Sequence, residues 1–147
     1  MGRKSEEERI KSIYKEYMNN SNTLNKWSSE IIGNRFIKEE FCKSFKYLIK
    51  KNNIDVINKT ILDIGCASGN KIKILLKIGF DKENIIGVDI RENCIKNAKL
   101  NFPGSKFYKM DARQIKFSDE KFDFINVFTL FSSILDDQNR YKVANEI

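Results

Sequence analysis

Thr60-Ile61-Leu62-Asp63-Ile64-Gly65-Cys66-Ala67-Ser68-Gly69-Asn70 is the stretch that decides the fold. Its first part is a short run of branched apolar residues, which predicts a buried parallel strand. The small residues that follow allow a sharp turn, and glycines let a backbone approach a ligand closely. In residues 71–79, apolar side chains then recur at helical spacing, at positions 72, 75, 76 and 78. The stretch therefore predicts a strand, a glycine loop and a helix whose N-terminus offers backbone N–H donors.

Two phosphate-binding patterns fail in this loop. The dinucleotide pattern G-x-G-x-x-G needs glycine where the chain has Ala67 and Asn70. The pattern G-x-x-x-x-G-K-[ST] fails because Gly69 comes one residue early. What remains is Asp63, two residues before a G-x-x-x-G loop. The alternative interpretation is an ordinary turn between a strand and a helix of a doubly wound fold.

A second acidic residue supports nucleoside binding. Residues 85–90 form another buried-strand run, and Asp89 lies 24 residues after Gly65. A βαβ unit places an acid at about this distance, at the tip of the next strand, where it can accept from ribose hydroxyls. The same acid would serve NAD, so it does not by itself indicate which cofactor binds.

Further segments complete an α/β pattern. Residues 106–110 and 122–128 predict a third and a fourth strand, and residues 91–100 predict a helix between the second strand and the third. After the fourth strand, Asp136 or Asp137 can cap a final helix that carries Tyr141, Ala144 and Ile147 on one face.

In this order and at these spacings, the segments resemble the first four motifs of class I S-adenosylmethionine-dependent methyltransferases, over residues 54–147. The resemblance implies an α/β, Rossmann-like, doubly wound and mainly parallel sheet of order 3-2-1-4. A complete class I fold continues with further strands. We therefore expect a chain truncated after the fourth strand, or a fragment of a longer protein, with the C-terminal strands missing.

The resemblance also implies a site for S-adenosyl-L-methionine. Gly65 and Gly69, with Cys66 and Ala67 between them, would let the loop reach the methionine part of the cofactor. Asp63 would hold the loop, or accept a hydrogen bond from the cofactor's amine directly or through water.

The nucleoside part would lie along the next strands. Asp89 would bind the ribose hydroxyls, and Ile90 would lie against the adenine. Asp111 would accept from the adenine amino group, with the backbone N–H of Ala112 at a ring nitrogen. The end of the fourth strand, from Asn126 to Phe128, would sit beside the sulfonium. The alternatives are that Asp111 is a turn residue before Arg113 and that Asp123 is a solvated residue at a strand start.

Residues 1–53 predict an N-terminal helical cap, separate from residues 54–147. A capping box of Ser5 and Glu8 begins a helix over 5–18, and a second helix runs over 34–51. Such helices cover the cofactor in the methyltransferases that this chain resembles.

Four residues of the cap are candidates for that cover. Tyr14, Tyr17 and Trp27 would shield the cofactor, and Arg35 would clamp its carboxylate through two hydrogen bonds. The alternative is that the aromatic residues fasten the helices to the sheet and that Arg35 is a surface charge.

Composition narrows the chemistry. The 147 residues carry a net charge of +7, but the lysines alternate with glutamates and apolar residues, as on a solvated helix face. We therefore favour a small-molecule acceptor over nucleic acid, although a basic chain is compatible with the latter.

The absence of histidine excludes Ser-His-Asp and Cys-His catalysis. Three distant cysteines predict reduced thiols in the cytoplasm and no zinc site. The chain shows no secretory signal and no membrane span.

Three hypotheses about function follow. The first is a methyltransferase, or its cofactor-binding half, which acts on an unidentified small-molecule or glycan-type acceptor. The second is a non-catalytic module that binds a nucleoside cofactor or a partner. The third is an NAD-type oxidoreductase, which the missing third glycine and the strand-borne Asp63 argue against. No catalytic base is marked, and an exposed fourth strand would favour self-association.

Overall fold

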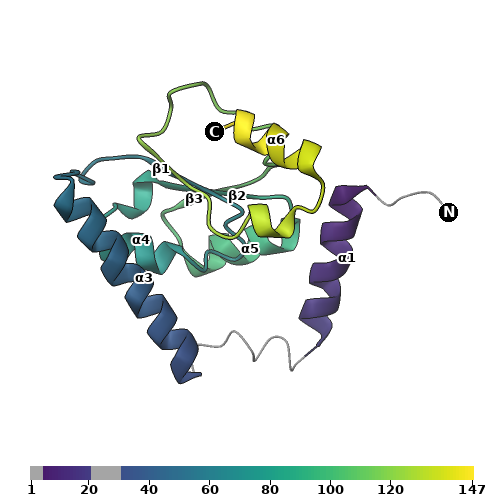
Figure 1. The fold of residues 1–147 in the computed structure, drawn as a ribbon, viewed down its shortest axis with the longest axis horizontal. Helices are drawn as coiled ribbons and strands as arrows, with labels where there is room; N and C mark the ends of the chain where they lie inside the picture. Colours follow the sequence, from purple (N-terminus) through teal and green to yellow (C-terminus); the bar gives the residue numbers. More distant parts are fainter. Residues whose placement is uncertain (1–4, 21–30) are drawn as a thin grey trace. The chain divides into compact units, whose positions relative to one another are not determined.

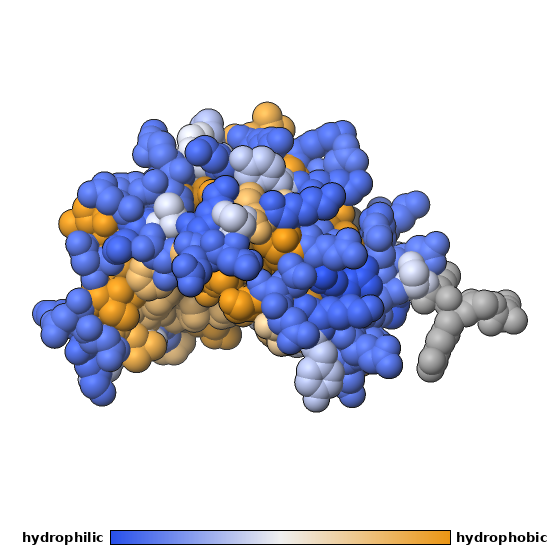
Figure 2. All heavy atoms as spheres, turned by 90° about the horizontal axis from the view of Figure 1, so that it is seen from above, coloured by the Kyte–Doolittle hydropathy of each residue, from blue (hydrophilic) through white to orange (hydrophobic). Residues whose placement is uncertain are grey.

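The computed structural model describes residues 5–20 and 31–147. The chain divides into two compact units, Met1–Ile54 and Asp55–Ile147. Among the residues that the structure describes, no helix is both long enough and apolar enough to cross a membrane. Figure 2 shows a surface on which hydrophilic residues predominate and hydrophobic residues gather in patches between them.

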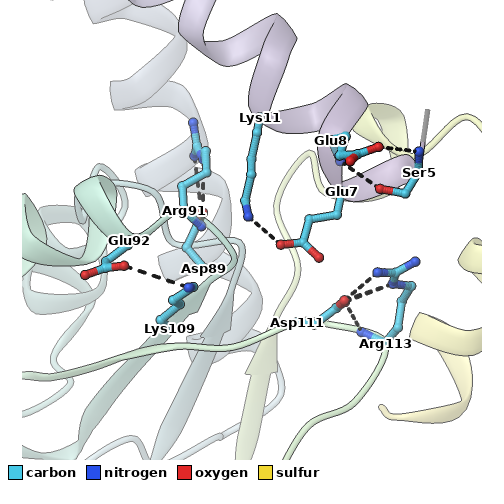
Figure 3. A network of polar contacts seen from close by, with 10 residues as sticks. All are labelled: Ser5, Glu7, Glu8, Lys11, Asp89, Arg91, Glu92, Lys109, Asp111 and Arg113. Atoms are coloured by element: carbon cyan, nitrogen blue, oxygen red, sulfur yellow. Dashed lines mark hydrogen bonds and ion pairs between the residues drawn. The ribbon is translucent and has the colours of Figure 1, made fainter.

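The first unit opens with α1 (Glu6–Asn19), and its predicted capping box is confirmed. The backbone N–H of Glu8 donates to Ser5 Oγ at 3.2 Å, and the N–H of Ser5 donates to Glu8 Oε2 at 2.9 Å. Figure 3 shows this reciprocal pair. Acidic residues fill the first turn, where they complement the positive end of the helix dipole.

The second helix of this unit, α3 (Ile32–Lys51), begins two residues earlier than predicted. None of its residues is buried, and Phe36, Ile37 and Leu48 are exposed although their spacing predicts an inward face. Periodicity shows only which side chains share a helix face; a neighbouring element has to cover that face before they become buried. Trp27, a predicted cover residue, lies outside the described residues.

The second unit contains a four-stranded sheet of order β3-β2-β1-β4, in which every pair is parallel. The strands are β1 (Ile61–Ile64), β2 (Ile85–Asp89), β3 (Lys106–Lys109) and β4 (Phe124–Asn126). This order and the parallel pairing confirm the predicted Rossmann-like fold. Every residue of β1 and β2 is buried, as in the central strands of a sheet that is covered on both faces.

Helices lie between and after these strands in the chain and cover both sides of the sheet (Figure 1). They are α4 (Ile72–Ile78), η1 (Lys82–Asn84), α5 (Glu92–Asn101), η2 (Phe131–Ser133) and α6 (Asp137–Asn145). On one face of the sheet, the buried side chains of β1 and β2 form an apolar cluster that consists of Leu62, Ile64, Ile86 and Val88. This packed sheet fixes the ends of its strands, where the predicted site lies.

The sequence predicts where the helices begin and end better than it predicts which of their faces are buried. The predicted cap of α6 is confirmed, because Asp136 Oδ1 accepts from the N–H of Asn139 at 2.8 Å. However, Tyr141 is 72% exposed, and Val143 is the buried residue of this helix. In α4, Ile74 is buried and Leu76 is exposed, the reverse of the expected pattern. The direction from which the neighbouring elements approach a short helix decides which of its residues they cover.

Candidate functional site

The loop after β1 is wound into left-handed backbone conformations. Gly65, Ala67 and Gly69 have φ values of 77°, 50° and 83°. The N–H groups of Gly65 and Cys66 both donate to the carbonyl oxygen of Val88, at 2.8 and 3.0 Å. The loop is therefore fastened to β2 immediately before the acid at the end of that strand.

Packing against other side chains explains why this loop has glycine at two positions, which the sequence did not show. A Cβ at Gly69 would lie 2.6 Å from the ring of Phe102, and a Cβ at Gly65 would lie 3.2 Å from Leu130 Cδ1. Both positions also have the positive φ that favours glycine. The Phe102 ring therefore leaves no room for a larger residue at Gly69, and Leu130 leaves little room at Gly65. The expected approach of a ligand stays a prediction.

The expected free donors at the start of α4 are partly used within the chain. The N–H of Ile72 donates to the Gly69 carbonyl at 3.0 Å, and the N–H of Ile74 donates to the Lys71 carbonyl at 2.9 Å. We therefore assign no ligand to the end of this seven-residue helix.

Asp63 is a buried acid with one side chain oxygen unsatisfied. Only 2% of the residue is exposed. Asn126 Nδ2, on β4, donates to Asp63 Oδ1 at 2.6 Å, whereas Oδ2 has no hydrogen-bond partner among the described residues. Burial raises the pKa of Asp63 to about 6, against the opposing effects of the Asn126 hydrogen bond and the charge of Lys71. A buried carboxylate oxygen without a donor is costly, so it indicates a missing cationic or hydrogen-bonding partner.

Asp89 connects the glycine loop to the end of β2. Its Oδ2 accepts from the N–H of Ala67 at 2.9 Å, and its Oδ1 accepts from the N–H of Arg91 at 2.9 Å. The Arg91 guanidinium donates to both oxygens, at 3.0 and 3.1 Å (Figure 3). Asp89 thus holds the loop in place, and Arg91 compensates its negative charge.

Asp111, just after β3, forms the same arrangement with Arg113. The N–H and Nε of Arg113 donate to Asp111 Oδ1 at 2.9 and 3.0 Å, and Nη2 donates to Oδ2 at 2.5 Å. Burial acts to raise the pKa of Asp111, but the hydrogen bonds and charge of Arg113 outweigh it and hold that pKa below its usual value. The side chain therefore shapes a turn before Arg113, and its contact with adenine stays a prediction.

The two arginines were missed by sequence reasoning, although a signal was present. Asp89-Ile90-Arg91 and Asp111-Ala112-Arg113 repeat the pattern D-x-R at the ends of neighbouring strands. An Asp side chain often accepts from the N–H two residues later, which places the second side chain beside it. This repeat would have predicted both ion pairs.

Lys71 is a third residue that the sequence did not mark. It lies between the glycine loop and α4, and its Nζ is 3.6 Å from the centroid of the Phe128 ring. Phe128 follows β4 by two residues, next to the strand end that carries Asn126. The charge of Lys71 lowers the pKa of Asp63, so the ammonium group lies within electrostatic reach of that buried carboxylate.

A family model described as a methyltransferase domain matches residues 61–147. The chain belongs to this methyltransferase domain family. Among curated proteins, no sequence matches it.

Solved structures of methyltransferases share the fold. A TehB-like SAM-dependent methyltransferase from Corynebacterium glutamicum is 22% identical, with a TM-score of 0.53 over 77% of this chain and 66% of that one. An S-adenosylmethionine-dependent methyltransferase from Clostridium acetobutylicum is 18% identical, with a TM-score of 0.65 over 85% and 50% of the two chains. Phosphoethanolamine N-methyltransferase 1 from Haemonchus contortus, in complex with phosphoethanolamine and S-adenosylhomocysteine, is 14% identical, with a TM-score of 0.64 over 98% and 29%.

The methyltransferase domain described here spans about two thirds of the first of these structures and half or less of the other two. At such low identity the likeness shows the fold alone. It agrees with the predicted class I sheet, and the identity of the acceptor does not follow from it.

In this methyltransferase domain, most of the predicted site residues lie at the carboxyl ends of β1, β2 and β4. Hydrogen bonds, strand pairing and packing bring together Asp63, Gly65, Cys66, Ala67, Gly69, Asp89 and Asn126. Ile90 directly follows β2, while Asp111 and Ala112 follow β3, and all three are half-buried. Arg35 lies in the first turn of α3, in the other unit, so its role stays a prediction.

Cys66 is a structural residue of the loop. It is buried, its Sγ would lie 2.9 Å from a Cβ placed at Gly87, and burial raises the pKa of its thiol. A thiol of this kind stays protonated and unreactive near neutral pH. Its contribution to the predicted site would come through its backbone.

Proposed function

We propose that this methyltransferase domain binds S-adenosyl-L-methionine at the carboxyl ends of β1, β2 and β4 and transfers the methyl group to a small-molecule or glycan-type acceptor. The observation that carries the proposal is the buried Oδ2 of Asp63 beside the glycine loop, to which none of the described residues donates a hydrogen bond. The family match supports the reaction class, and open α/β sheets of this topology bind ligands at the carboxyl ends of their strands, which supports the proposed location.

The residues fit the cofactor's amino-acid end. A buried carboxylate that lacks a donor is complementary to an ammonium group, which carries donors and the opposite charge. Asn126 orients the carboxyl group by binding Oδ1, so that Oδ2 is the oxygen left for the ligand. Asp63 would therefore accept from the cofactor's amine directly.

The nucleoside end requires a rearrangement at Asp89. Its two oxygens already accept four hydrogen bonds, from Ala67 and Arg91. A carboxylate offers about four lone-pair positions, so the ribose hydroxyls would have to replace the Arg91 guanidinium on at least one oxygen. The loop contact with Ala67 would stay in place. By the same reasoning, Asp111 would have to share an oxygen with Arg113 to accept from adenine, and Ile90 would lie against the ring.

The methyl group of a sulfonium is already activated when the cofactor is bound. The chain's own contribution would then be to position the donor beside Asn126 and to exclude water. With no histidine in the sequence, an oxygen acceptor would need Asp, Glu, Lys or Tyr as its base. The second hypothesis, a module that binds the cofactor without turnover, differs from the first only in the transfer step.

The helical cap predicted over residues 1–53 would cover the cofactor. Tyr14 and Tyr17 form an edge-on pair with ring centroids 5.9 Å apart, which gives α1 an aromatic patch that suits such a cover. Arg35 would contribute to binding of the cofactor's carboxylate. If Arg35→Ala leaves the affinity for S-adenosylhomocysteine unchanged, this part of the proposal is wrong.

The expected partner is a small molecule. Several basic residues of the first unit pair with glutamates on their own helix, as Lys11 does with Glu7 and Lys43 with Glu40, which favours a solvated surface over a nucleic-acid interface. All three cysteines are free, which suits the reducing cytoplasm.

The test is a calorimetric titration of the 147-residue chain with S-adenosylhomocysteine and, separately, with NADH. We expect the chain to bind S-adenosylhomocysteine with micromolar affinity and not to bind NADH. Binding should be lost in Asp89→Ala. It should be retained in Arg91→Met, because this variant leaves the Asp89 oxygens to the ligand. A folded chain that binds neither compound, or that binds NADH, would contradict the proposal. Release of S-adenosylhomocysteine from S-adenosylmethionine in the presence of candidate acceptors then distinguishes an enzyme from a binding module.

A further inference from the structure

Helix α6 contacts the predicted adenine end of the site through one side chain. We propose that Asn139 is a positioning residue that acts through Arg113. It holds the Arg113 guanidinium when the adenine amino group replaces part of it on Asp111, and in this way it contributes to the preference for adenine. This inference rests on the proposed function and deepens it, because it assigns a role to a residue outside the predicted site.

Arg113 is shared between Asp111 and α6. Its Nη2 donates to Asp111 Oδ2 at 2.5 Å, and its Nε donates to Oδ1 and Oδ2 at 3.0 and 3.1 Å (Figure 3). Its Nη1 donates to Asn139 Oδ1 at 3.1 Å. A guanidinium presents its donors in a rigid, planar fork. One part of that fork therefore binds the acid while another part binds the helix.

The position of Asn139 is fixed by the way α6 is held. Asp136 Oδ1 accepts from the backbone N–H of Asn139 at 2.8 Å, which secures the first turn. Glu146 Oε2, at the other end of the helix, accepts from the backbone N–H of Ile115 at 2.7 Å. Val143, between these contacts, is fully buried. The helix is therefore attached to the segment after β3 at both of its ends, so Asn139 Oδ1 is a well-placed acceptor.

Binding of adenine at Asp111 requires Arg113 to give up part of its contact. A carboxylate offers about four lone-pair positions, and the donors of Arg113, including its backbone N–H, already occupy them. Each hydrogen bond that a half-buried guanidinium loses has a cost. Because Asn139 already accepts from Nη1, the guanidinium can turn towards α6 and release one Asp111 oxygen while it stays bound to the protein.

The charge of Asp111 decides which purine can use the released oxygen. The effect of burial on the pKa of Asp111 is outweighed by the hydrogen bonds and charge of Arg113, which hold that pKa below its usual value. An ionised carboxylate only accepts hydrogen bonds. It would therefore bind the amino group of adenine and repel an oxygen atom at the same position of the ring.

Two ligands test this selectivity. S-adenosylhomocysteine carries the adenine amino group, and S-inosylhomocysteine carries an oxygen in its place. We would measure both affinities by calorimetry for the whole chain and for Asn139→Ala, Asn139→Asp and Gln138→Ala, with circular dichroism as a check of folding. Gln138→Ala is the matched control, because Gln138 is an exposed amide that directly precedes Asn139 in the same helix.

We expect Asn139→Ala to reduce the preference for S-adenosylhomocysteine over S-inosylhomocysteine by about two- to ten-fold, the effect of one net hydrogen bond. Asn139→Asp should keep or increase the preference, because a carboxylate holds a guanidinium more strongly than an amide does. Gln138→Ala should leave the preference unchanged. An unchanged preference in Asn139→Ala would overturn the inference.

A double-mutant cycle shows whether Asn139 acts through Arg113. Arg113→Met removes the guanidinium, so Asn139→Ala should have no further effect on the preference in that background. A loss of preference that persists there would overturn the inference. Equal weakening of both ligands by Asn139→Ala would also overturn it, because Asn139 would then only support the packing of α6.

The wild-type chain separates this inference from the proposed function, and it is measured before any variant. If it does not bind S-adenosylhomocysteine, the proposed function itself is wrong and the inference falls with it. If it binds both ligands with equal affinity, cofactor binding stands but Asp111 does not recognise the adenine amino group, and the inference alone is overturned.

Discussion

At the scale of single residues, Asp63 shows how a binding group is held ready at a cost to stability. Its carboxyl group is buried, and burial raises its pKa to about 6, whereas an ordinary Asp has a pKa near 3.8. A buried acid with a raised pKa binds its proton more tightly in the folded state than in the unfolded state. The free energy of unfolding therefore falls as pH rises from about 4 to about 6.

This cost predicts that Asp63→Asn stabilises the ligand-free protein at neutral pH. The amide keeps an oxygen for the Asn126 hydrogen bond and removes the buried charge. We expect a gain on the order of 1–2 kcal/mol at pH 7, less than the full cost of the pKa shift because the new amide donor is left unpaired. Urea unfolding at pH 5 and pH 7 measures it. The gain should shrink at pH 5, and a gain that does not depend on pH would contradict the assigned cause.

A second prediction compares two glycines. Gly69→Ala places a methyl group against the Phe102 ring and keeps a positive φ, and we expect it to cost about 2–4 kcal/mol. Gly33→Ala, in α3, meets nothing within 4 Å and should be neutral or stabilising by up to about 1 kcal/mol. Thermal unfolding of both variants measures the difference. Equal effects would show that the loop is not packed as described.

Sequence reasoning predicted the central features of the site because they depend on local pattern. The buried runs of β1 and β2, and the acid that each of them contains, can be identified from residue type and spacing alone. The partners of those acids could not be predicted in this way. Asn126 reaches Asp63 only because β4 pairs in parallel with β1, and the two residues are 63 positions apart in the sequence. The contact of Lys71 with Phe128 depends on the same pairing.

At the scale of elements, β4 illustrates how neighbouring residues limit the length of a strand. The apolar run predicts a strand over 122–128, but the strand covers only Phe124–Asn126. At its start, Asp123 Oδ2 accepts from the N–H and Oγ1 of Thr60, at 2.8 and 2.9 Å. Beyond its end, Thr129 has a φ of 61°, which turns the chain out of the sheet. Asp123 is therefore more than the solvated residue that its position suggested.

We predict that Asp123 stabilises the pairing of β4 with β1. The backbone N–H of Thr60, followed by Lys59, lowers the pKa of Asp123 to about 2. Because the folded-state pKa is below the unfolded value, this stabilisation is complete above about pH 4 and is lost as pH falls towards 2. Asp123→Ala should lower the melting temperature at pH 7. Between pH 4 and pH 2, the melting temperature of this variant should fall less steeply than that of the wild-type chain.

The matched control for this prediction is Asp119→Ala, since Asp119 is exposed and lies in the same loop. It should leave the melting temperature nearly unchanged. A similar loss in both variants would mean that the loop, and not the contact with Thr60, accounts for the effect.

At the scale of the whole molecule, the sheet ends at β3 on one side and at β4 on the other, within the part of the chain that the structure describes. An uncovered edge of a sheet can pair with a second copy of the chain. In β4, Phe124 N donates to Thr60 O, towards β1, so the backbone groups of Ile125 point the other way. We propose that this outer row of backbone groups supports self-association.

We therefore predict concentration-dependent association that Ile125→Pro reduces. Proline removes the outward N–H of Ile125 and leaves the hydrogen bonds between β4 and β1 intact. Sedimentation velocity over a range of concentrations measures the effect, with circular dichroism as a check of folding. A wild-type chain that stays monomeric throughout would show that β4 does not associate in this way.

The raised pKa of Asp63 also means that ligand binding should release a proton from the domain to the solvent. In mildly acidic solution part of the population carries a proton on this carboxyl group, because its pKa is about 6. An arriving ammonium group stabilises the ionised form and expels that proton into the buffer. The heat of binding at such a pH should therefore vary with the ionisation enthalpy of the buffer chosen, and this dependence should vanish at pH 8. In Asp63→Asn it should be absent at every pH.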